Sequence, residues 1–415
     1  MEYIKREIEE KIEKFIKRKE IIGIRGPRQC GKTTLLKIIS KKIEGEKVYV
    51  DFYDLEAREN FEKNPIDFVK RYKKNKLFLF LDEIQKVKYA GEKLKLIYDS
   101  FDDLKIFISG SSSLELKTNV LKDLVGRIIL FNLYTFNFFE FLSSKDEGLA
   151  KIVKEKRESL RKFLEDKDEV SYPSFNEEIL KYWKEYVIFG GYPEVVKAKN
   201  EEKIVLLKNI FNTYIEKDVV NFFEIHDTSK FLDLVRILSF RTSNLISIST
   251  LASELRLNYE KVEKFLDVLI HSYIIYLVKP FYKNLVTEIR KIPKIYFLDL
   301  GIRNCAIDNF LEFDKRSDKG EIAENFVFRE ILVNFDDWKI NYWRTTGKAE
   351  IDFVLTKNEK IVPIEVRLSG NKLGKSFYSF IRAYKPEKAI VFTLDKVEKK
   401  IVGNTLLYFL PIYYI

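Results

Sequence analysis

Cysteine and histidine are nearly absent from this chain. Its 415 residues include only two cysteines, Cys30 and Cys305, and two histidines, His226 and His271. Two cysteines cannot form a disulfide framework or a cysteine-based zinc site, and two histidines leave little room for histidine–metal chemistry. We therefore expect a cytoplasmic protein in a reducing compartment.

Long apolar runs and a secretory signal are also lacking. No stretch approaches the ~18 consecutive apolar residues that a membrane span requires. The N-terminus, MEYIKREIEEKIEKF, has no apolar segment of a signal peptide. We therefore expect no membrane partner. Hydrophobic residues make up 46% of the chain and aromatic residues 14%, which is enough to build packed cores and argues against disorder as the main state.

Length and charge limit the organisation and the partners. At about 100–200 residues per domain, a chain of this length predicts two to four domains. The formal net charge of +10 allows binding to a polyanion such as DNA, but it is equally explained by solubility.

Short apolar segments alternate with helical stretches in the first third of the chain. Helices are expected over residues 1–20 and from Lys32 to Ile43. Alternation of this kind predicts an α/β domain, with a parallel sheet and crossover helices on both faces. The expected strands are Ile21–Ile24, Val48–Phe52, Leu77–Leu81, Lys105–Ser109 and Ile128–Leu133.

A glycine-rich turn follows the first expected strand. Residues 26–33 read GPRQCGKT and fit the pattern G-x-x-x-x-G-K-[ST], with a strand before it and a helix after it. In that setting backbone amides surround a phosphate, the lysine reaches the β- and γ-phosphates, and the next hydroxyl lies on Mg²⁺. Lys32 is also a candidate catalytic residue. The predicted nucleotide-binding residues of this loop are Gly26, Pro27, Arg28, Gln29, Cys30, Gly31, Lys32, Thr33 and Thr34.

A pair of acids follows the expected strand Leu77–Leu81, which is apolar at every position. A strand that is apolar on both faces lies in the middle of a sheet, and ligands bind at the C-terminal edge of such sheets. We expect Asp82 to hold Mg²⁺ together with Thr33, and Glu83 to orient and deprotonate the attacking water. Ser109, at the tip of the next strand, is expected between these acids and the γ-phosphate.

Arg127 precedes the last of these strands. It is a candidate to contact a phosphate in the same chain or, as an arginine finger, the nucleotide of a neighbouring subunit. A plain surface arginine fits the sequence equally well. A finger acting in trans would imply a homo-oligomer.

Five segments of the chain resemble a known family. They read GPRQCGKTTLL, FLDEIQKV, SGSSS, LVGRIILFNLYTFNFFEFL and, at residues 190–196, GGYPEVV. They look like the prokaryotic, notably archaeal, AAA-type ATPases that contain a DUF4143 domain, and the resemblance covers most of the chain. It implies an AAA-type P-loop domain, ATP rather than GTP, and Mg²⁺ as cofactor.

The chain divides into four expected parts. An ATPase core over residues 1–143 is followed by a charged insertion or linker over 144–178, which we expect to carry at most one solvated helix. A helical lid with a winged helix-turn-helix is expected over 179–285, and an α/β domain similar to restriction endonucleases over 286–415.

The expected winged helix begins with two helices, Ile246–Leu255 and Tyr259–Leu269, and continues with a strand, Ser272–Phe281, that leads to a wing. The second helix of such a unit can enter the major groove of DNA. Its exposed face here mixes glutamate and lysine, so contact with DNA and contact with protein remain alternatives.

The end of the chain resembles the PD-(D/E)xK nuclease fold. Glu324 lies on an expected helix, Glu350 and Asp352 share one face of a hairpin strand, and Glu365 and Arg367 share a face of the next strand. By this resemblance Asp352 and Glu365 would be metal ligands and Glu324 the helical acid. Arg367 stands where the family has its catalytic lysine, and arginine cannot act as a tunable amine. Cleavage of DNA and a degenerate domain for binding or regulation are therefore the alternatives.

One main hypothesis and two alternatives follow. The main hypothesis is an ATPase that acts as a switch or motor coupled to C-terminal modules that contact DNA or protein. The alternatives are an ATP-regulated, metal-dependent DNA nuclease and a non-enzymatic DNA-binding regulator that uses the winged helix.

Overall fold

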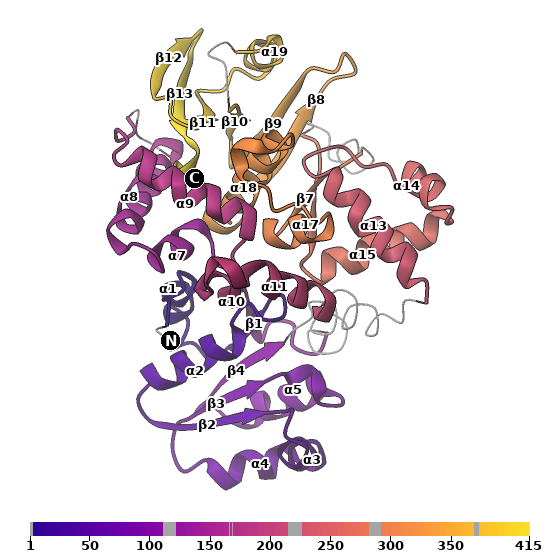
Figure 1. Ribbon diagram of the computed structural model, residues 1–415. Coiled ribbons are helices and arrows are strands. Elements are labelled where there is room, and N and C mark those ends of the chain that lie inside the picture. Colours follow the sequence, from indigo (N-terminus) through magenta and orange to yellow (C-terminus); the bar gives the residue numbers. More distant parts are fainter. Residues whose placement is uncertain are drawn as a thin grey trace. The chain divides into compact units, whose positions relative to one another are not determined.

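The computed structural model describes residues 3–110, 122–165, 167, 169–214, 226–281, 292–368 and 373–415. The chain forms two compact units, one made of Met1–Thr135 with His271–Tyr273, the other of Phe136–Ile270 with Ile274–Ile415. Figure 1 shows the helices and strands along the chain. Among the described residues, no helix combines the length and the apolar character that a membrane crossing requires.

The first unit is built on a five-stranded sheet in the order β2-β3-β4-β1-β5. Every neighbouring pair in it is parallel. This confirms the predicted α/β fold with a parallel sheet, and each strand lies within two residues of its expected position. The strands are β1 (Ile21–Arg25), β2 (Glu46–Asp51), β3 (Leu77–Asp82), β4 (Leu104–Gly110) and β5 (Ile128–Asn132).

Apolar side chains cover both faces of this sheet. Leu79 and Leu81 belong to one buried cluster with residues of the helices that follow β2 and β3. Phe78 and Phe80 belong to another cluster, with residues of the helix that follows β1. Successive side chains of a strand point to opposite faces, so a continuously apolar strand must be covered on both sides. The helices of this unit are α1 (Ile8–Glu13), α2 (Lys32–Lys42), α3 (Leu55–Lys63), α4 (Pro65–Tyr72) and α5 (Ala90–Ser100), with a 3₁₀ turn at Ile84–Lys86.

The N-terminal helix is shorter than the sequence pattern predicted. A helix was expected over residues 1–20, but α1 covers only Ile8–Glu13. Its start is fixed because the backbone N–H of Arg6 donates to a carboxylate oxygen of Glu9 at 2.7 Å. After it the chain turns so that Phe15 and Ile16 pack against the sheet.

The second unit begins with helices. The segment 144–178, expected to be a charged linker, holds α8, and this helix is not solvated on all sides: Leu160 and Phe163 are buried. The Phe163 ring lies edge-on to Tyr408 at 5.1 Å. The helices up to residue 211 are α7 (Phe138–Ser143), α8 (Glu147–Glu165), α9 (Asn176–Phe189), α10 (Pro193–Lys197) and α11 (Asn200–Phe211).

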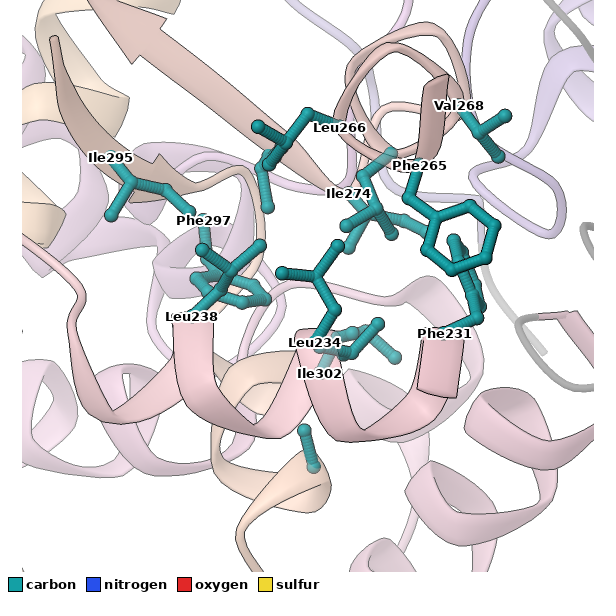
Figure 2. Close-up of a cluster of buried hydrophobic side chains, with 14 of the residues drawn as sticks. Phe231, Leu234, Leu238, Phe265, Leu266, Val268, Ile274, Ile295, Phe297 and Ile302 are labelled. Atoms are coloured by element: carbon teal, nitrogen blue, oxygen red, sulfur yellow. The ribbon is translucent and has the colours of Figure 1, made fainter. Parts of the chain in front are cut away.

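Four further helices and a hairpin share one hydrophobic cluster. Phe231, Leu234 and Leu238 recur on one side of α13 and point into this cluster (Figure 2). Their partners come from the following elements, so the core is contributed by segments far apart in the sequence. The elements are α13 (Thr228–Phe240), α14 (Ile248–Leu255), α15 (Tyr259–His271), the antiparallel strands β6 (Ile275–Val278) and β7 (Lys294–Phe297), and α17 (Leu300–Ala306). The expected wing falls largely on residues 282–291, outside the described residues.

The end of the second unit is a six-stranded sheet in the order β12-β13-β11-β10-β9-β8. The pairs β10–β11 and β11–β13 are parallel and the others antiparallel. The helix, hairpin and strand expected around the C-terminal acids are all present as α18, β8–β9 and β10. The elements are α18 (Lys319–Asn334), β8 (Lys339–Arg344), β9 (Glu350–Lys357), β10 (Lys360–Val366), α19 (Lys375–Tyr384), β11 (Lys388–Thr393), β12 (Glu398–Val402) and β13 (Thr405–Pro411), with 3₁₀ turns at Phe313–Lys315 and Ile412–Tyr414.

Candidate functional site

The glycine-rich loop joins the C-terminal end of β1 to the first turn of α2. Gly31 has φ +100°, which L-residues with a side chain rarely adopt. A Cβ on Gly26 would lie 1.9 Å from the backbone oxygen of Leu133. Both glycines are therefore required by the backbone path itself. The other loop residues are Pro27, Arg28, Gln29 and Cys30.

Lys32 is the first residue of α2 and is buried. Its Nζ donates to the backbone oxygens of Gly26, at 3.1 Å, and Pro27, at 2.6 Å. Thr33 and Thr34 follow in the same first turn, where Thr33 is half-buried and Thr34 exposed. Backbone amides and the helix dipole at such a terminus favour an anion. The loop thus combines a cation with the N-terminus of an 11-residue helix.

Arg6 braces the loop from the N-terminal segment. Its buried guanidinium donates to the backbone oxygen of Cys30 at 2.9 Å and to that of Tyr134 at 2.7 Å. The thiol of Cys30 donates to the backbone oxygen of Leu133 at 3.3 Å. These contacts tie the loop to the segment that follows β5.

The acid pair lies on the same edge of the sheet as the loop. Asp82 ends β3, and β4 lies between β3 and β1. The Asp82 carboxylate is fully buried; one of its oxygens accepts from the hydroxyl of Ser109, at the end of β4. The other accepts from the Tyr49 hydroxyl at 2.6 Å. The edge therefore brings Asp82 and Ser109 into direct contact, and Ser109 occupies the strand between the acids and the loop.

Glu83 stands in an unusual backbone conformation, with φ 55° and ψ 44°. Its backbone N–H donates to the Ser109 hydroxyl oxygen at 3.2 Å. Its carboxylate accepts from the side-chain amide of Gln85 at 2.5 Å. A left-handed residue that is not glycine stores strain and is enriched at functional sites. The neighbouring serines Ser111, Ser112 and Ser113 lie outside the described residues.

Arg127 lies at the opposite end of the strands, where β1 and β5 begin. Ile21, the first residue of β1, donates its N–H to the backbone oxygen of Arg127 at 2.8 Å, whereas the loop begins after Arg25. These two ends of β1 are roughly 13 Å apart at ~3.3 Å per residue. The guanidinium pairs instead with Asp99 at 2.9 Å. The expectation that Arg127 reaches a phosphate in the same chain was therefore wrong, and a role in trans stays a prediction.

The acids of the second unit gather around a lysine that the sequence analysis did not single out. The Lys294 ammonium is 3.0 Å from Glu324, 2.6 Å from Glu350 and 3.9 Å from Asp352. The Tyr296 hydroxyl donates to the same oxygen of Glu324 at 2.6 Å. Burial raises the pKa of Glu324 to about 7, although Lys294 opposes this shift.

Glu365 and Arg367 form a second pair beside this group. The Arg367 guanidinium donates to Glu365 at 2.7 Å, and one oxygen of Asp352 accepts from the backbone N–H of Val366 at 2.8 Å. Burial raises the pKa of Glu365 to about 7, with Arg367 opposing the shift. Among the residues that the structure describes, no group of three or more histidine, cysteine or carboxylate side chains is arranged to hold a metal ion.

Comparison with known proteins places this geometry in a family. An AAA domain matches residues 18–142, and the domains of unknown function DUF8612 and DUF4143 match residues 180–312 and 319–415. The uncharacterized protein MJ1544 of Methanocaldococcus jannaschii is 30% identical over an alignment of 392 residues, and the match covers 91% of this chain and 81% of that protein. The chain belongs to the family of AAA-type ATPase-domain proteins with a C-terminal DUF4143 domain.

The family extends beyond archaea. An uncharacterized protein of Haemophilus influenzae is 25% identical over 361 residues, covering 83% of this chain and 81% of its own length. A solved structure, the Walker-type ATPase PABY2304 of Pyrococcus abyssi, is 14% identical and covers 74% of this chain and 96% of its own, with a TM-score of 0.46. At that score the likeness adds nothing to the topology described above.

Four side chains around these sites went unrecognised in the sequence. Arg6 and Tyr49 lie in no motif, and Gln85, although it lies within FLDEIQKV, was given no role, because these roles depend on which strands and loops become neighbours. Lys294 had a usable signal: it is a charged residue at the start of KIYF, an otherwise apolar strand. A buried charge in such a strand requires a partner of opposite sign.

Proposed function

We propose that this protein binds and hydrolyses ATP with Mg²⁺, and that the nucleotide state of its first unit switches or drives its C-terminal modules. The observation that carries the proposal is the single sheet edge on which the glycine-rich loop, the acid pair and Ser109 are neighbours. The AAA domain match over residues 18–142 supports the same assignment.

The loop residues account for binding of the triphosphate. The amides at the start of α2 and the ammonium of Lys32 offer donors and positive charge to phosphate oxygens. Ligand binding must free Lys32 from the backbone oxygens of Gly26 and Pro27, to which it donates in this structure. The resemblance to AAA-type ATPases supports ATP over GTP.

The oxygens that Mg²⁺ prefers are those of carboxylates and hydroxyls. Thr33 on α2 and Asp82 at the end of β3 would hold the ion, and the buried Asp82 carboxylate is already oriented by Tyr49 and Ser109. When bound, the ion supplies positive charge against the phosphates. Tyr49 and Ser109 keep the carboxylate fixed, so little reorganisation of it is needed.

Hydrolysis requires a group that orients and deprotonates water, and Glu83 is our candidate. Its carboxylate is now held by Gln85. We expect this hydrogen bond to give way when water is positioned. The backbone of Glu83 is linked through Ser109 to Asp82, which couples the two acids mechanically.

Two pairs of variants test the proposal. Lys32→Ala is compared with Lys41→Ala, which removes an exposed charge from the same helix. Glu83→Gln is compared with Glu92→Gln, an exposed acid on α5. Binding is measured by titration with a fluorescent ATP analogue, and turnover by phosphate release. We expect Lys32→Ala to lose binding, and Glu83→Gln to bind ATP and release phosphate at least 100-fold more slowly. Retained affinity in the first variant, or normal turnover in the second, would refute the assignment.

The structure gives less support to DNA binding by α15. The exposed residues of this helix include Glu260, Glu263 and Asp267 but, among lysines, only Lys264. Lys261 is engaged by Asp227. DNA carries dense negative charge, so an acidic helix face is repelled by it. We therefore keep protein contact as the expected role of this winged-helix-like unit, and DNA binding as the alternative, to be tested by the effect of DNA on ATP turnover.

A further inference from the structure

Lys294 is the first residue of β7 and is almost fully buried, with 3% of its side chain exposed. Its neighbours on the strand explain the orientation. Ile295 and Phe297 point into the hydrophobic cluster of α13 and α15 (Figure 2). Because side chains alternate along a strand, Lys294 and Tyr296 project from the opposite face. There Tyr296 stacks on Phe328 of α18, with ring centroids 4.4 Å apart.

This opposite face meets the acids of the C-terminal part. Glu324 comes from α18, and Glu350 and Asp352 come from β9. The ammonium lies within 4 Å of all three carboxylates, and Tyr296 adds a second donor to Glu324. Burial by itself would lower the pKa of Lys294, but Glu324, Asp352 and Glu350 outweigh it and raise the pKa above its usual value. Independently of that shift, three carboxylates within 4 Å of one ammonium favour its charged form.

Other acidic oxygens in this region also have partners. Arg344 donates to Glu350 at 3.0 Å, and Arg367 to Glu365 at 2.7 Å. Val366 supplies its backbone N–H to Asp352. Four carboxylates thus face three cationic side chains of the same chain, and the local charge is nearly balanced without an added ion.

A divalent ion would have to compete with this arrangement. Mg²⁺ needs near-octahedral oxygen ligands at about 2.0–2.1 Å. An ammonium that already contacts Glu324 and Glu350 fills the space beside these oxygens and repels a second cation. The residues expected from the nuclease resemblance therefore do not fit a metal in this chain.

We propose that Lys294 is the resident cation of this acid cluster, and that the cluster fastens β7 to α18 and β9 instead of holding a metal for cleavage of DNA. The C-terminal part then works as a binding or regulatory element. Its link to the β6–β7 hairpin consists of the ion pairs of Lys294, here called the ion-pair lock. The lock breaks only if Lys294 moves away from the three carboxylates. This inference is independent of ATP hydrolysis.

The test asks whether removing the lysine creates a metal site. The full chain carries Asp82→Asn throughout, so that the nucleotide unit does not contribute. Free Mn²⁺ is measured by electron paramagnetic resonance in this background, in Lys294→Met, and in the control Lys319→Met. The control removes a lysine at the start of α18, the helix that carries Glu324. We expect Lys294→Met to bind Mn²⁺ at least tenfold more tightly than the other two, and a further Asp352→Asn change to abolish the gain.

Two results would overturn the proposal. One is Mn²⁺ binding, or Mn²⁺-dependent cleavage of labelled DNA, that the chain shows with Lys294 in place and loses in Asp352→Asn. The other is a folded Lys294→Met variant that gains no Mn²⁺ affinity.

The double variant Lys294→Met/Glu324→Gln covers the case in which Lys294→Met does not fold. Glu324→Gln removes the charge that the lysine balances and keeps the side-chain shape. Urea unfolding is followed by tryptophan fluorescence, because Trp183, Trp338 and Trp343 all lie in this second unit. We expect the double variant to show a cooperative urea transition where Lys294→Met shows none, or a transition at higher urea where Lys294→Met shows one. A double variant no more stable than Lys294→Met would contradict the lock.

Discussion

Replacing Tyr49 by phenylalanine removes one hydroxyl group and nothing else from the neighbourhood of Asp82. The ring stays able to stack on Phe80, 6.5 Å away. The hydroxyl donates to a fully buried carboxylate at 2.6 Å. A hydrogen bond to a charged group contributes about 1.5–3 kcal/mol, more when its loss leaves the buried partner unsatisfied. We expect the free energy of unfolding of the first unit to fall by about this amount.

Hydrogen exchange measured by mass spectrometry suits this unit, because all three tryptophans lie in the other one. A loss of about 1.5–3 kcal/mol speeds exchange through unfolding by about 10- to 150-fold. The amides of β2 and β3 should show it. Tyr72→Phe is the control, since this side chain is 46% exposed and its ring also packs on a phenylalanine, Phe68. Equal exchange in the two variants would refute the role given to Tyr49.

Three further predictions concern the loop, the arginine and a buried ion pair. Gly26→Ala should abolish ATP binding, measured by titration, because the added methyl group would lie 1.9 Å from the Leu133 oxygen; unchanged affinity would contradict the loop geometry. Arg127→Ala should leave the affinity for ATP within twofold in dilute protein, since Arg127 lies at the end of the strands opposite the loop. A large loss of affinity would show that Arg127 contacts the nucleotide in its own chain. Asp318 has its pKa lowered to about 2, because hydrogen bonds from two buried arginines outweigh the effect of burial. A lowered pKa stabilises the fold above the unfolded value of 3.8, and this stability, about 2.5 kcal/mol, is lost as pH falls towards 2. Asp318→Asn should therefore flatten the decline of the urea midpoint between pH 4 and 2, and an unchanged slope would argue against the assignment.

The sheet of the first unit was predictable because its strands are short, mostly apolar and alternate with helical stretches. A strand such as LFLFL cannot be exposed on either face, so its central position follows directly. The loop and the acid pair could be placed on one edge because all these strands are parallel and their carboxyl ends meet there.

Other features depend on tertiary neighbours and had no local signature. The contact between Tyr49 and Asp82 needs β2 beside β3 in the observed register. The position of Arg127 needed the pairing of β5 with β1. The burial of α8 within segment 144–178 was missed for another reason. Many charged residues separate the members of an apolar stripe, which α8 buries: Leu149, Val153, Leu160 and Phe163.

Lys32 donates to two carbonyl groups of its own loop. An anion that approaches it must replace both interactions. A chloride or a single sulfate ion has fewer acceptor atoms to offer in exchange, whereas a chain of phosphates can engage Lys32 and the amides at the start of α2 together. The cost of releasing Lys32 from these carbonyl groups therefore weighs more on a small anion than on a ligand with several charged groups in a row.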